Sequence, residues 1–376
     1  MSAQPTGPRE LPGLDVAGLA TWLAREHPEL AGSGVGPDLT ASLITGGHSN
    51  LTYRVDGAAK PLVLRRPPLG HVLSTAHDMR REHRVITALA GTIPVPPTVA
   101  VVDDSEAAEV TGTVFFVMEH VAGTVLARPE HNAAWTSDGL GRLAIELVEV
   151  LADLHTTDPA AVGLADFGRP AGYLARQVKT WRRQYDASRS RPQPLLDTLQ
   201  DRLAVAVPDD GARTGIVHGD YRLDNVLVAG SPDAPHITAV LDWEMATLGD
   251  PLMDLGMLGM YWHIRDLTEA AGVDDVAGAI APGAGYPDFA EVTDAYAARA
   301  GIAVPDLSWY RAFACYKLAV ILEGIHYRFT GGQTVGAGFD HIGAMVAPLA
   351  DEGLARLAGA SSGSAPHGPG TTGGGA

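Results

Sequence analysis

The chain has 376 residues, 46% of them hydrophobic, which is enough for about two or three domains with sizeable cores. Its 44 acidic and 27 basic residues give a net charge of −17 without a block of clustered lysine and arginine, which excludes nucleic acid as a main partner. No segment approaches the ~18 uninterrupted apolar residues of a membrane span, and the chain opens without a signal-peptide pattern, so we expect a cytoplasmic protein that does not enter a membrane.

The first predicted elements follow a Pro/Gly-rich N-terminus, 1–12, that we expect to be disordered. A helical pattern covers 14–26, and short runs typical of β-strands come next. These runs, each flanked by Gly, Pro or Asp, cover residues 51–55, 61–65, 97–102 and 112–118, and a helical run at 79–90 interrupts them. This order predicts a β-rich N-terminal lobe at 13–121.

The remaining sequence is mostly helical. After about residue 125, apolar residues recur at helical spacing, as at Leu143, Leu147, Leu151 and Leu154. The simplest fold class is therefore α+β, with a small β-rich N-lobe and a larger helical C-lobe at 122–350 that meet near 119–126. A Gly/Ser/Thr-rich tail at 359–376 is expected to be disordered. The single cysteine, Cys315, is expected to be a small buried side chain in a reducing compartment.

A glycine-rich turn lies between two of the β-like runs. Its residues are Gly46, Gly47, His48, Ser49 and Asn50. Glycine lets backbone N–H groups approach phosphates closely, so the turn can bind phosphate, although a Gly-Gly hairpin turn is an equal alternative. In the next strand, over 62–66, Val63 and Arg65 share one face and Arg66 takes the other, because side chains alternate.

Two polar clusters in the C-lobe carry the chemistry. The first is His218-Gly219-Asp220-Tyr221-Arg222-Leu223-Asp224-Asn225, and the second is Leu241-Asp242-Trp243-Glu244. Short strands at 226–228 and 237–241, joined by a turn at 229–236, predict a hairpin that brings Asn225 and Asp242 together. An amide oxygen and a carboxylate are the hard ligands that Mg²⁺ prefers, and Asp220 can orient an attacking hydroxyl and accept its proton.

These two clusters resemble the catalytic loop and metal site of the aminoglycoside phosphotransferase-like family, which shares the protein-kinase fold. The resemblance covers roughly 12–345 and implies a bilobal kinase that uses ATP and Mg²⁺. It implies that Asp220 is the catalytic base, that Asn225 and Asp242 are metal ligands, and that His218 is a structural residue of the loop. The segment 249–255 matches the family too, so Asp254 is expected to brace the loop by hydrogen bonds. For Asp224 and Asp250, an exposed loop position or a helix cap is favoured.

The same resemblance assigns a nucleotide site in the N-lobe. Val63 is expected against adenine, and Arg65, favoured over Arg66, stands where the family normally has a phosphate-binding lysine. Arginine can bind phosphate bidentately without losing its charge. Glu82 is either the partner that holds Arg65 or a member of a surface pair with neighbouring arginines. The backbone of Glu119 and Val121 is expected to meet the adenine edge.

The acceptor is expected to be a small molecule. Only eleven residues separate Asp242 from Asp254, which is too few for the activation segment on which protein kinases dock peptides. The run from Gly46 to Tyr53 and the run at 163–173 resemble the kinase-like domains at the front of some long acyl-CoA dehydrogenases, which implies a hydroxyacyl thioester. Some aromatic residues could line the acceptor pocket, although core packing is favoured for them. They are Trp181, Tyr185, Tyr261, Trp262 and Tyr327.

Two other functions stay open at this point. A nucleotide-binding pseudokinase is suggested by the arginine at the lysine position, and a kinase for aminoglycoside or macrolide antibiotics is suggested by the net acidity. The sequence leaves the oligomeric state undecided, with a homodimer as one possibility.

Overall fold

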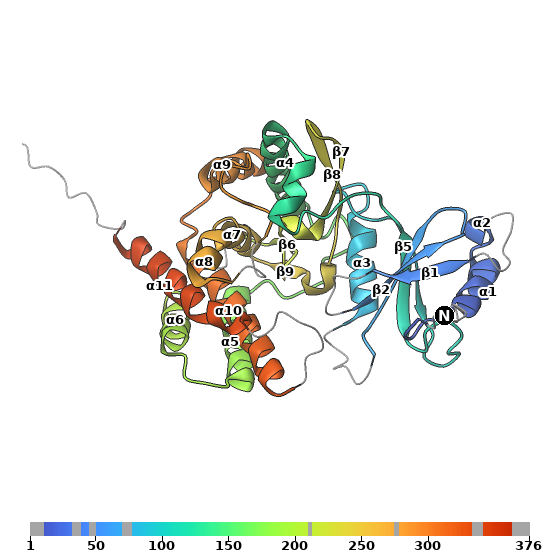
Figure 1. Ribbon diagram of the computed structural model, residues 1–376, viewed down its shortest axis with the longest axis horizontal. Helices are drawn as coiled ribbons and strands as arrows, with labels where there is room; N and C mark the ends of the chain where they lie inside the picture. Colours follow the sequence, from blue (N-terminus) through green and yellow to red (C-terminus); the bar gives the residue numbers. More distant parts are fainter. Residues whose placement is uncertain are drawn as a thin grey trace, which may run out of the picture. The chain divides into compact units, whose positions relative to one another are not determined.

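A computed structural model describes residues 11–31, 39–44, 50–69, 77–209, 213–273, 278–332 and 341–362 (Figure 1). The chain divides into two compact units, and each is described by itself. The first unit holds residues 1–126, 156–167 and 224–246, and the second holds 127–155, 168–223 and 247–376. Two stretches beyond residue 126 therefore belong with the β-rich part of the chain.

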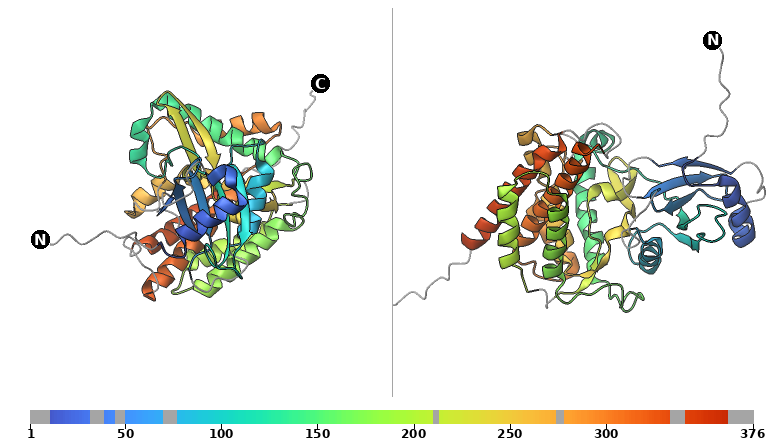
Figure 2. Two further views of the ribbon diagram at one scale, coloured as in Figure 1. Left: turned by 90° about the vertical axis from the view of Figure 1, so that its right-hand side faces the viewer. Right: turned by 90° about the horizontal axis from the view of Figure 1, so that it is seen from below.

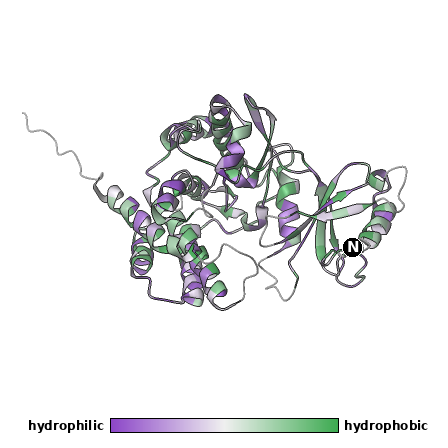
Figure 3. Ribbon diagram, in the orientation of Figure 1, coloured by the Kyte–Doolittle hydropathy of each residue, from purple (hydrophilic) through white to green (hydrophobic). Residues whose placement is uncertain are grey.

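The first unit is built on a five-stranded antiparallel sheet in the order β1-β2-β3-β5-β4. The strands are β1 (Thr40–Leu43), β2 (Leu51–Asp56), β3 (Leu62–Arg66), β4 (Thr98–Asp103) and β5 (Val114–Glu119). The strand at 62–66 lies in the middle of the sheet, and Val63 pairs with Met118 of β5. The central strands are largely hydrophobic, as expected for a sheet with a covered face (Figure 3).

Three helices complete this part of the first unit: α1 (Val16–Glu26), α2 (Pro28–Ala31) and α3 (Met79–Leu89). Asp15 and Asp78 cap α1 and α3, because each carboxylate accepts two backbone N–H groups of the first turn. Helix α1 places Leu19 and Trp22 in a core that also contains Tyr53 and Phe115. The predicted helices and strands of this lobe are thereby confirmed.

The first residues of the described chain are more ordered than expected. The hydroxyl of Tyr53 donates to the carbonyl of Pro12, and Leu11 forms a bridge with Leu14. At the other end, α11 (Val346–Ser362) includes residues 359–362, which the composition assigns to a disordered tail. Leu354, Leu357 and the alanines around them continue the helical pattern up to that segment.

A hairpin at 226–240 belongs to the first unit. Strands β7 (Val226–Ser231) and β8 (Ala234–Val240) pair antiparallel, with Val226 opposite Val240. The Leu241 N–H donates to the Asn225 carbonyl at 2.8 Å, which confirms that the hairpin brings the two ends together. The strands are longer than predicted, because Pro235, Ile237 and Ala239 alternate as buried positions. Only Pro232 and Asp233 remain for the turn.

The second unit is mainly helical. Its helices are α4 (Ser137–Thr156), α5 (Tyr173–Ser188), α6 (Pro194–Val205), α7 (Leu252–Tyr261), α8 (Ile264–Ala271), α9 (Phe289–Ala300), α10 (Ser308–Thr330) and α11, with short 3-10 turns at η1 (Pro129–Ala134) and η4 (Ile342–Met345). Helix α10 packs against α5, α6, α7 and α11 (Figure 2). The predicted apolar stripe of α4 is confirmed, since Leu143, Leu147, Leu151 and Leu154 are all fully buried.

A small two-stranded sheet positions the two segments that matter most in this unit. Strand β6 (Gly215–Val217) pairs with β9 (Thr247–Gly249), with Ile216 opposite Leu248. Strand β6 leads into the loop of His218, and β9 leads into α7 and Asp254. The pairing therefore sets the two polar segments side by side.

Most of the aromatic residues proposed for a pocket are core residues. Trp181, Tyr185 and Trp262 are buried, whereas Tyr327 is exposed. Cys315 is buried in α10, as predicted, and burial raises the pKa of its thiol to about 12. Of the helices that the structure describes, none combines the length and apolar character needed to cross a bilayer.

Asp104 gives a test of the first unit. Its buried carboxylate accepts the backbone N–H groups of Glu109, Val110, Thr111 and Gly112 at 2.6–2.9 Å. We predict that Asp104→Ala lowers the free energy of unfolding by about 3 kcal/mol, because four backbone N–H donors lose a charged acceptor. Urea denaturation measures the change. The exposed neighbour Asp103 is the control, since Asp103→Ala removes only exposed contacts, an ion pair to Arg80 and a hydrogen bond from the Ser105 N–H.

The pH dependence of this stabilisation has a definite sign. Burial acts to raise the pKa of Asp104, but its four N–H donors outweigh burial and hold the pKa below the ordinary value. Because the folded-state pKa is depressed, the stabilisation is complete above the unfolded pKa and is lost as the pH falls through the folded pKa. Equal stability of the Asp104 and Asp103 variants across that range would contradict this account.

Candidate functional site

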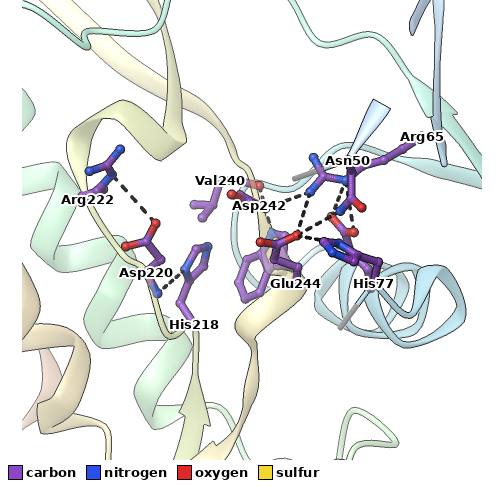
Figure 4. Close-up of polar contacts among 11 residues, drawn as sticks. Asn50, Arg65, His77, His218, Asp220, Arg222, Val240, Asp242 and Glu244 are labelled. Carbon is purple, nitrogen blue, oxygen red and sulfur yellow. Dashed lines mark hydrogen bonds and ion pairs between the residues drawn. The ribbon is translucent and has the colours of Figure 1, made fainter. Parts of the chain in front are cut away.

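The first group of polar side chains surrounds Arg65 in the first unit. From the middle of the sheet, Arg65 Nε reaches Glu82 Oε1 on α3 at 3.0 Å, and Nη2 reaches Asp242 Oδ1 at 2.8 Å (Figure 4). Arg66 points to the other face and donates to the carbonyls of Gly13 and Thr111. The structure thus settles two open choices: Arg65 rather than Arg66 faces the carboxylates, and Glu82 is buried and holds it.

Asp242 owes its direction to an uncommon backbone conformation. It follows β8 directly and has φ +64°, in the left-handed region that aspartate tolerates better than most residues. The chain then enters η3 (Trp243–Met245), where the buried Trp243 indole donates to the Val240 carbonyl at 3.0 Å. The anchored tryptophan fixes the turn, so the Asp242 carboxylate is held towards Arg65. Backbone strain of this kind is typical of functional sites.

Glu244 adds a third carboxylate to this group. The buried Asn50 donates from Nδ2 to Glu244 Oε2 at 2.9 Å, and that oxygen lies 3.9 Å from both Arg65 Nη2 and His77 Nδ1 (Figure 4). Within the described part of the chain, Asn50 Oδ1 and His77 Nδ1 are buried without a hydrogen-bond partner. Burial and the charge of Arg65 lower the pKa of His77, which keeps the imidazole neutral at pH 7.

The charges of this group do not cancel. Arg65 faces three carboxylates, those of Glu82, Asp242 and Glu244. Burial, followed by the charges of Asp242 and Glu244, raises the pKa of Glu82 to about 7, although Arg65 opposes the change. When all three carboxylates are ionised, the group has a net charge of −2 (three negative charges and one positive), which suits a divalent cation.

The second group is the loop 218–220 in the second unit. His218 is fully buried, and its Nδ1 accepts the N–H of Asp220 at 3.2 Å. Gly219 has φ +88°, which glycine adopts without steric cost. Asp254, at the start of α7, accepts the N–H groups of His218 at 2.7 Å and Gly219 at 2.8 Å. Asp254 thus binds the backbone of the loop through two N–H groups, as expected of a brace, and His218 is buried within the loop.

A buried network supports Asp254 in turn. His155 Nε2 lies 3.2 Å from Asp254 Oδ2, and its Nδ1 lies 2.9 Å from the hydroxyl of Tyr296. Burial acts to raise the pKa of Asp254, but the hydrogen bond from His155 and the backbone donors outweigh it and lower the pKa. The carboxylate therefore stays ionised in the core and keeps its hold on the loop.

Asp220 lies beside positive charge. Arg222 Nε is 3.9 Å from Asp220 Oδ2 (Figure 4). The Arg222 guanidinium lies over the ring of Tyr261, 4.7 Å from its centre. The next tyrosine of the motif, Tyr221, is buried and donates to the Leu147 carbonyl at 2.7 Å. The loop is thus held at both of its flanks while the Asp220 side chain stays partly exposed.

The remaining residues predicted to bind the nucleotide are described only in part. Gly46, Gly47 and Ser49 lie outside the described residues. Val63 is buried in the sheet, and Glu119 ends β5, where its N–H donates to Pro97 and its carboxylate pairs with Lys60. Val121 follows that strand and is half-buried. Their contacts with a nucleotide stay predictions.

Asp224 and Asp250 were expected as exposed loop residues or helix caps. Asp250 is a cap: its Oδ1 accepts the Leu252 N–H at 3.0 Å, and Oδ2 accepts the Tyr310 hydroxyl at 2.8 Å. It is also buried, so exposure was the wrong alternative, and the Tyr310 hydroxyl compensates for that burial. Asp224 lies half-buried in η2 (Leu223–Asn225).

Sequence reasoning gave no role to four residues of these groups. Glu244 and Arg222 stand inside the two motifs, so their position was a usable signal. Lys317 is the one charged residue in the apolar run 313–320, which was also a signal. The sequence holds no signal for His77, because only the fold brings it near Glu244.

The predicted site residues fall into two sets. Among the described residues, eight belong to the first unit: Asn50, Val63, Arg65, Glu82, Glu119, Val121, Asn225 and Asp242. Three belong to the second: His218, Asp220 and Asp254. In the first set Arg65 forms ion pairs with Glu82 and Asp242, and in the second Asp254 braces the loop that carries Asp220.

Comparison with known proteins identifies the family. The model of the phosphotransferase enzyme family, APH, matches residues 40–312. The chain belongs to this family. Phosphotransferases of this kind act on hydroxyl groups, and the family model spans both units described above.

Three similar proteins illustrate how the chain relates to others. Acyl-CoA dehydrogenase family member 11 of Gallus gallus is 33% identical over 350 residues, which cover 90% of this chain and 43% of the relative. A solved structure from Ralstonia eutropha, provisionally assigned as an aminoglycoside phosphotransferase, is 34% identical with a TM-score of 0.73, covering 92% of this chain and 99% of that one. The GDP complex of aminoglycoside 2'-phosphotransferase-IIIa has a TM-score of 0.58 at 18% identity, covering 91% and 99%, which shows likeness of fold.

These findings confirm the expected family, the kinase-like fold and the likeness to acyl-CoA dehydrogenases. The chain spans less than half the length of the curated relative that it matches. The activity of that longer protein is therefore not transferred to this chain by the match.

The Arg65 group gives a pH-dependent prediction. Because the folded-state pKa of Glu82 lies above its unfolded value, the stability that it contributes is present below about pH 4.5 and is lost as the pH rises through about 7. We predict that Glu82→Gln, which cannot ionise, becomes progressively more stable than the wild type between pH 5 and 8. Thermal melts at closely spaced pH values measure this difference. A difference that stays constant over that range would refute the assigned pKa shift.

The brace of the loop gives a second prediction. Asp254→Asn is expected to lower the free energy of unfolding by about 3 kcal/mol, because the amide cannot serve two N–H donors and His155 with one oxygen. Urea denaturation measures the loss, and hydrogen exchange should show weaker protection of the His218 and Gly219 amides. Asp306→Asn is the control and should change little, since Asp306 is exposed and, within the described residues, accepts the N–H and hydroxyl of Ser308.

Proposed function

We propose that this chain is an ATP- and Mg²⁺-dependent phosphotransferase that acts on a hydroxyl of a small molecule. The observation that carries the proposal is the ion-pair bridge of Arg65, which joins Glu82 to Asp242 at 3.0 and 2.8 Å. A phosphate-binding cation and a metal-binding carboxylate must be neighbours in such an enzyme, because the metal and the cation act on the same phosphates. Membership of the phosphotransferase family supports the same reading.

The nucleotide is assigned to the first unit. Val63 offers an apolar surface for adenine, and Arg65 offers the two donors of its guanidinium to phosphate oxygens. The backbone N–H groups of Glu119 and His120 already donate to Pro97 and Pro61, so we assign the adenine contacts to the Glu119 carbonyl and the Val121 N–H. GDP in the 2'-phosphotransferase of the same fold supports a nucleotide of this general kind.

The oxygen donors suit Mg²⁺ when a nucleotide is present. Within the described residues, no cluster of three His, Cys, Asp or Glu side chains could hold a metal by itself. Mg²⁺ needs only one or two protein ligands when phosphates supply the others, and Asn225 and Asp242 provide an amide oxygen and a carboxylate from the ends of one hairpin. When bound, the ion would neutralise phosphate charge, and metal affinity should depend on the nucleotide.

Asp220 is assigned to the acceptor. Its place five residues before Asn225 puts the acid and a metal ligand in one motif, and Asp254 fixes the loop backbone on which it stands. In the proposed reaction the Asp220 carboxylate orients the acceptor hydroxyl and accepts its proton as the oxygen bonds to the γ-phosphorus and ADP leaves. Arg65 stabilises the negative charge of the phosphates.

A small acceptor fits the chain between Asp242 and Asp254. This stretch consists of η3, β9 and the beginning of α7, so it is occupied by structured elements throughout. It offers no long loop on which a peptide could dock. The family likeness to acyl-CoA dehydrogenase family members supports a hydroxyacyl thioester as the acceptor.

The charges near Asp220 argue against a polycationic acceptor. Arg222 lies 3.9 Å from the Asp220 carboxylate, and Lys317 lies close enough for its charge to interact with Asp220. An aminoglycoside carries several ammonium groups, which these two cations would repel. We therefore rank an antibiotic kinase below an enzyme for a neutral or anionic acceptor.

The decisive experiment measures ADP release with hydroxyacyl thioesters, sugars, aminoglycosides and macrolides. We predict turnover with at least one hydroxyacyl thioester in the presence of Mg²⁺.

Asp220→Asn should reduce kcat at least about 1,000-fold and leave Mg-ATP binding intact, because the carboxylate acts on the acceptor. Asp242→Asn should weaken Mg²⁺-dependent ATP binding by calorimetry, and Asp158→Asn, an exposed substitution, serves as the control.

The alternatives give different results in the same experiment. Tight Mg-ATP binding without turnover of any acceptor would favour the pseudokinase. Turnover of aminoglycosides or macrolides alone, with resistance in a sensitive host, would favour the antibiotic kinase. Wild-type turnover by the Asp220 variant would disprove the assigned base.

A further inference from the structure

Lys317 is a buried lysine of the second unit to which the proposed reaction has so far given no role. It stands in the middle of α10 among apolar neighbours and is 5% exposed. Its Nζ donates to the carbonyl of Gly219 at 2.6 Å, and the amine lies over the ring of Trp181, 5.4 Å from its centre. The carbonyl that it binds belongs to the peptide that leads directly into Asp220.

Burying a lysine side chain costs free energy. An ammonium group loses its hydration in the core, and an apolar side chain of similar volume is often as stable or more stable at such a place. Burial lowers the pKa of Lys317, whereas the carboxylates of Asp220 and Asp254 oppose the change and favour the charged form. The lysine therefore interacts with the two acids of the catalytic loop across the packed interior of one unit.

The loop is held from two sides as a result. Asp254 binds the N–H side of the loop, at His218 and Gly219, and Lys317 binds the carbonyl of Gly219. Gly219 has φ +88°, and glycine can adopt many other backbone angles. Both contacts are therefore needed to fix the orientation of the Gly219–Asp220 peptide. The orientation of the Gly219–Asp220 peptide decides the direction in which the Asp220 side chain leaves the backbone.

We propose that Lys317 is a positioning residue of the phosphotransfer reaction, which fixes the Gly219–Asp220 peptide and places positive charge beside Asp220. This inference rests on the proposed function. The bound carbonyl sets the direction in which the Asp220 carboxylate leaves the backbone. Lys317 thus acts on the reaction through this peptide and through its charge, whose interaction with Asp220 is attractive.

The chain contains a matched control on the same helix. Arg311 of α10 also donates to a backbone carbonyl, that of Gly259 at 3.2 Å, and its guanidinium lies over the ring of Phe289 at 5.2 Å. It is six residues from Lys317, on another face of the helix, and its contacts lie in α7 and α9. Replacing Arg311 by methionine removes a similar cation without touching the catalytic loop.

The test compares Lys317→Met, Lys317→Arg and Arg311→Met in the full chain, with the acceptor found for the wild type. We expect Lys317→Met to reduce kcat about 100-fold, because a displaced reacting group costs that order of rate, while KM for ATP stays within about twofold. Lys317→Arg should recover about tenfold of the loss. Arg311→Met should keep the wild-type kcat, and its melting temperature should fall at least as far as that of Lys317→Met.

Each outcome decides the matter. If Lys317→Met keeps the wild-type kcat while the wild type and Arg311→Met turn over, the positioning role is wrong and the proposed function stands. If both methionine variants lose kcat in proportion to their melting temperatures, Lys317 is only structural. If the wild type turns over no acceptor, the proposed function fails, and the role of Lys317 fails with it.

Discussion

A charge that is removed from water must be met by opposite charges or by hydrogen-bond partners, and this constraint organises both halves of the chain. In the first unit Arg65 is largely buried and lies between two carboxylates, Glu82 and Asp242. In the second unit Asp254 is fully buried and receives two backbone N–H groups and His155. Each arrangement can be stable only with one geometry, so each fixes a side chain or a backbone segment that chemistry can use.

The arginine at the position of the usual lysine is explained by the same constraint. Glu82 and Asp242 approach Arg65 from different elements, α3 and the end of β8. A guanidinium presents several donors in a fixed plane and can bind both carboxylates at once, whereas an ammonium is a single point of charge. The substitution therefore preserves the link between helix α3 and Asp242, and it gives no structural reason to regard the chain as inactive.

The two halves differ in charge, and this difference bears on substrate choice. The Arg65 group has more carboxylates than cations, which suits a nucleotide that arrives with a divalent metal. Asp220 has Arg222 beside it and Lys317 behind its loop. A hydroxyl on a neutral or anionic molecule meets no repulsion there, while a polycation would. The acidity of the whole chain, −17, is thus a poor guide to the acceptor, because two cations, Arg222 and Lys317, lie near Asp220.

The bracing role of Asp254, which lies 36 residues from His218, was implied only by the family resemblance. Short-range patterns in the sequence determined the strands and helices of both lobes and the hairpin that joins Asn225 to Asp242. These follow from side-chain periodicity and from motifs whose members are few residues apart, so local geometry suffices. The partner of Glu82, the capping and burial of Asp250, and the contact of Lys317 with Gly219 were decided only by tertiary structure. Each joins residues far apart in sequence, 17 residues for Glu82 and Arg65 and 98 for Lys317 and Gly219, and no periodicity records which distant groups will share a buried charge.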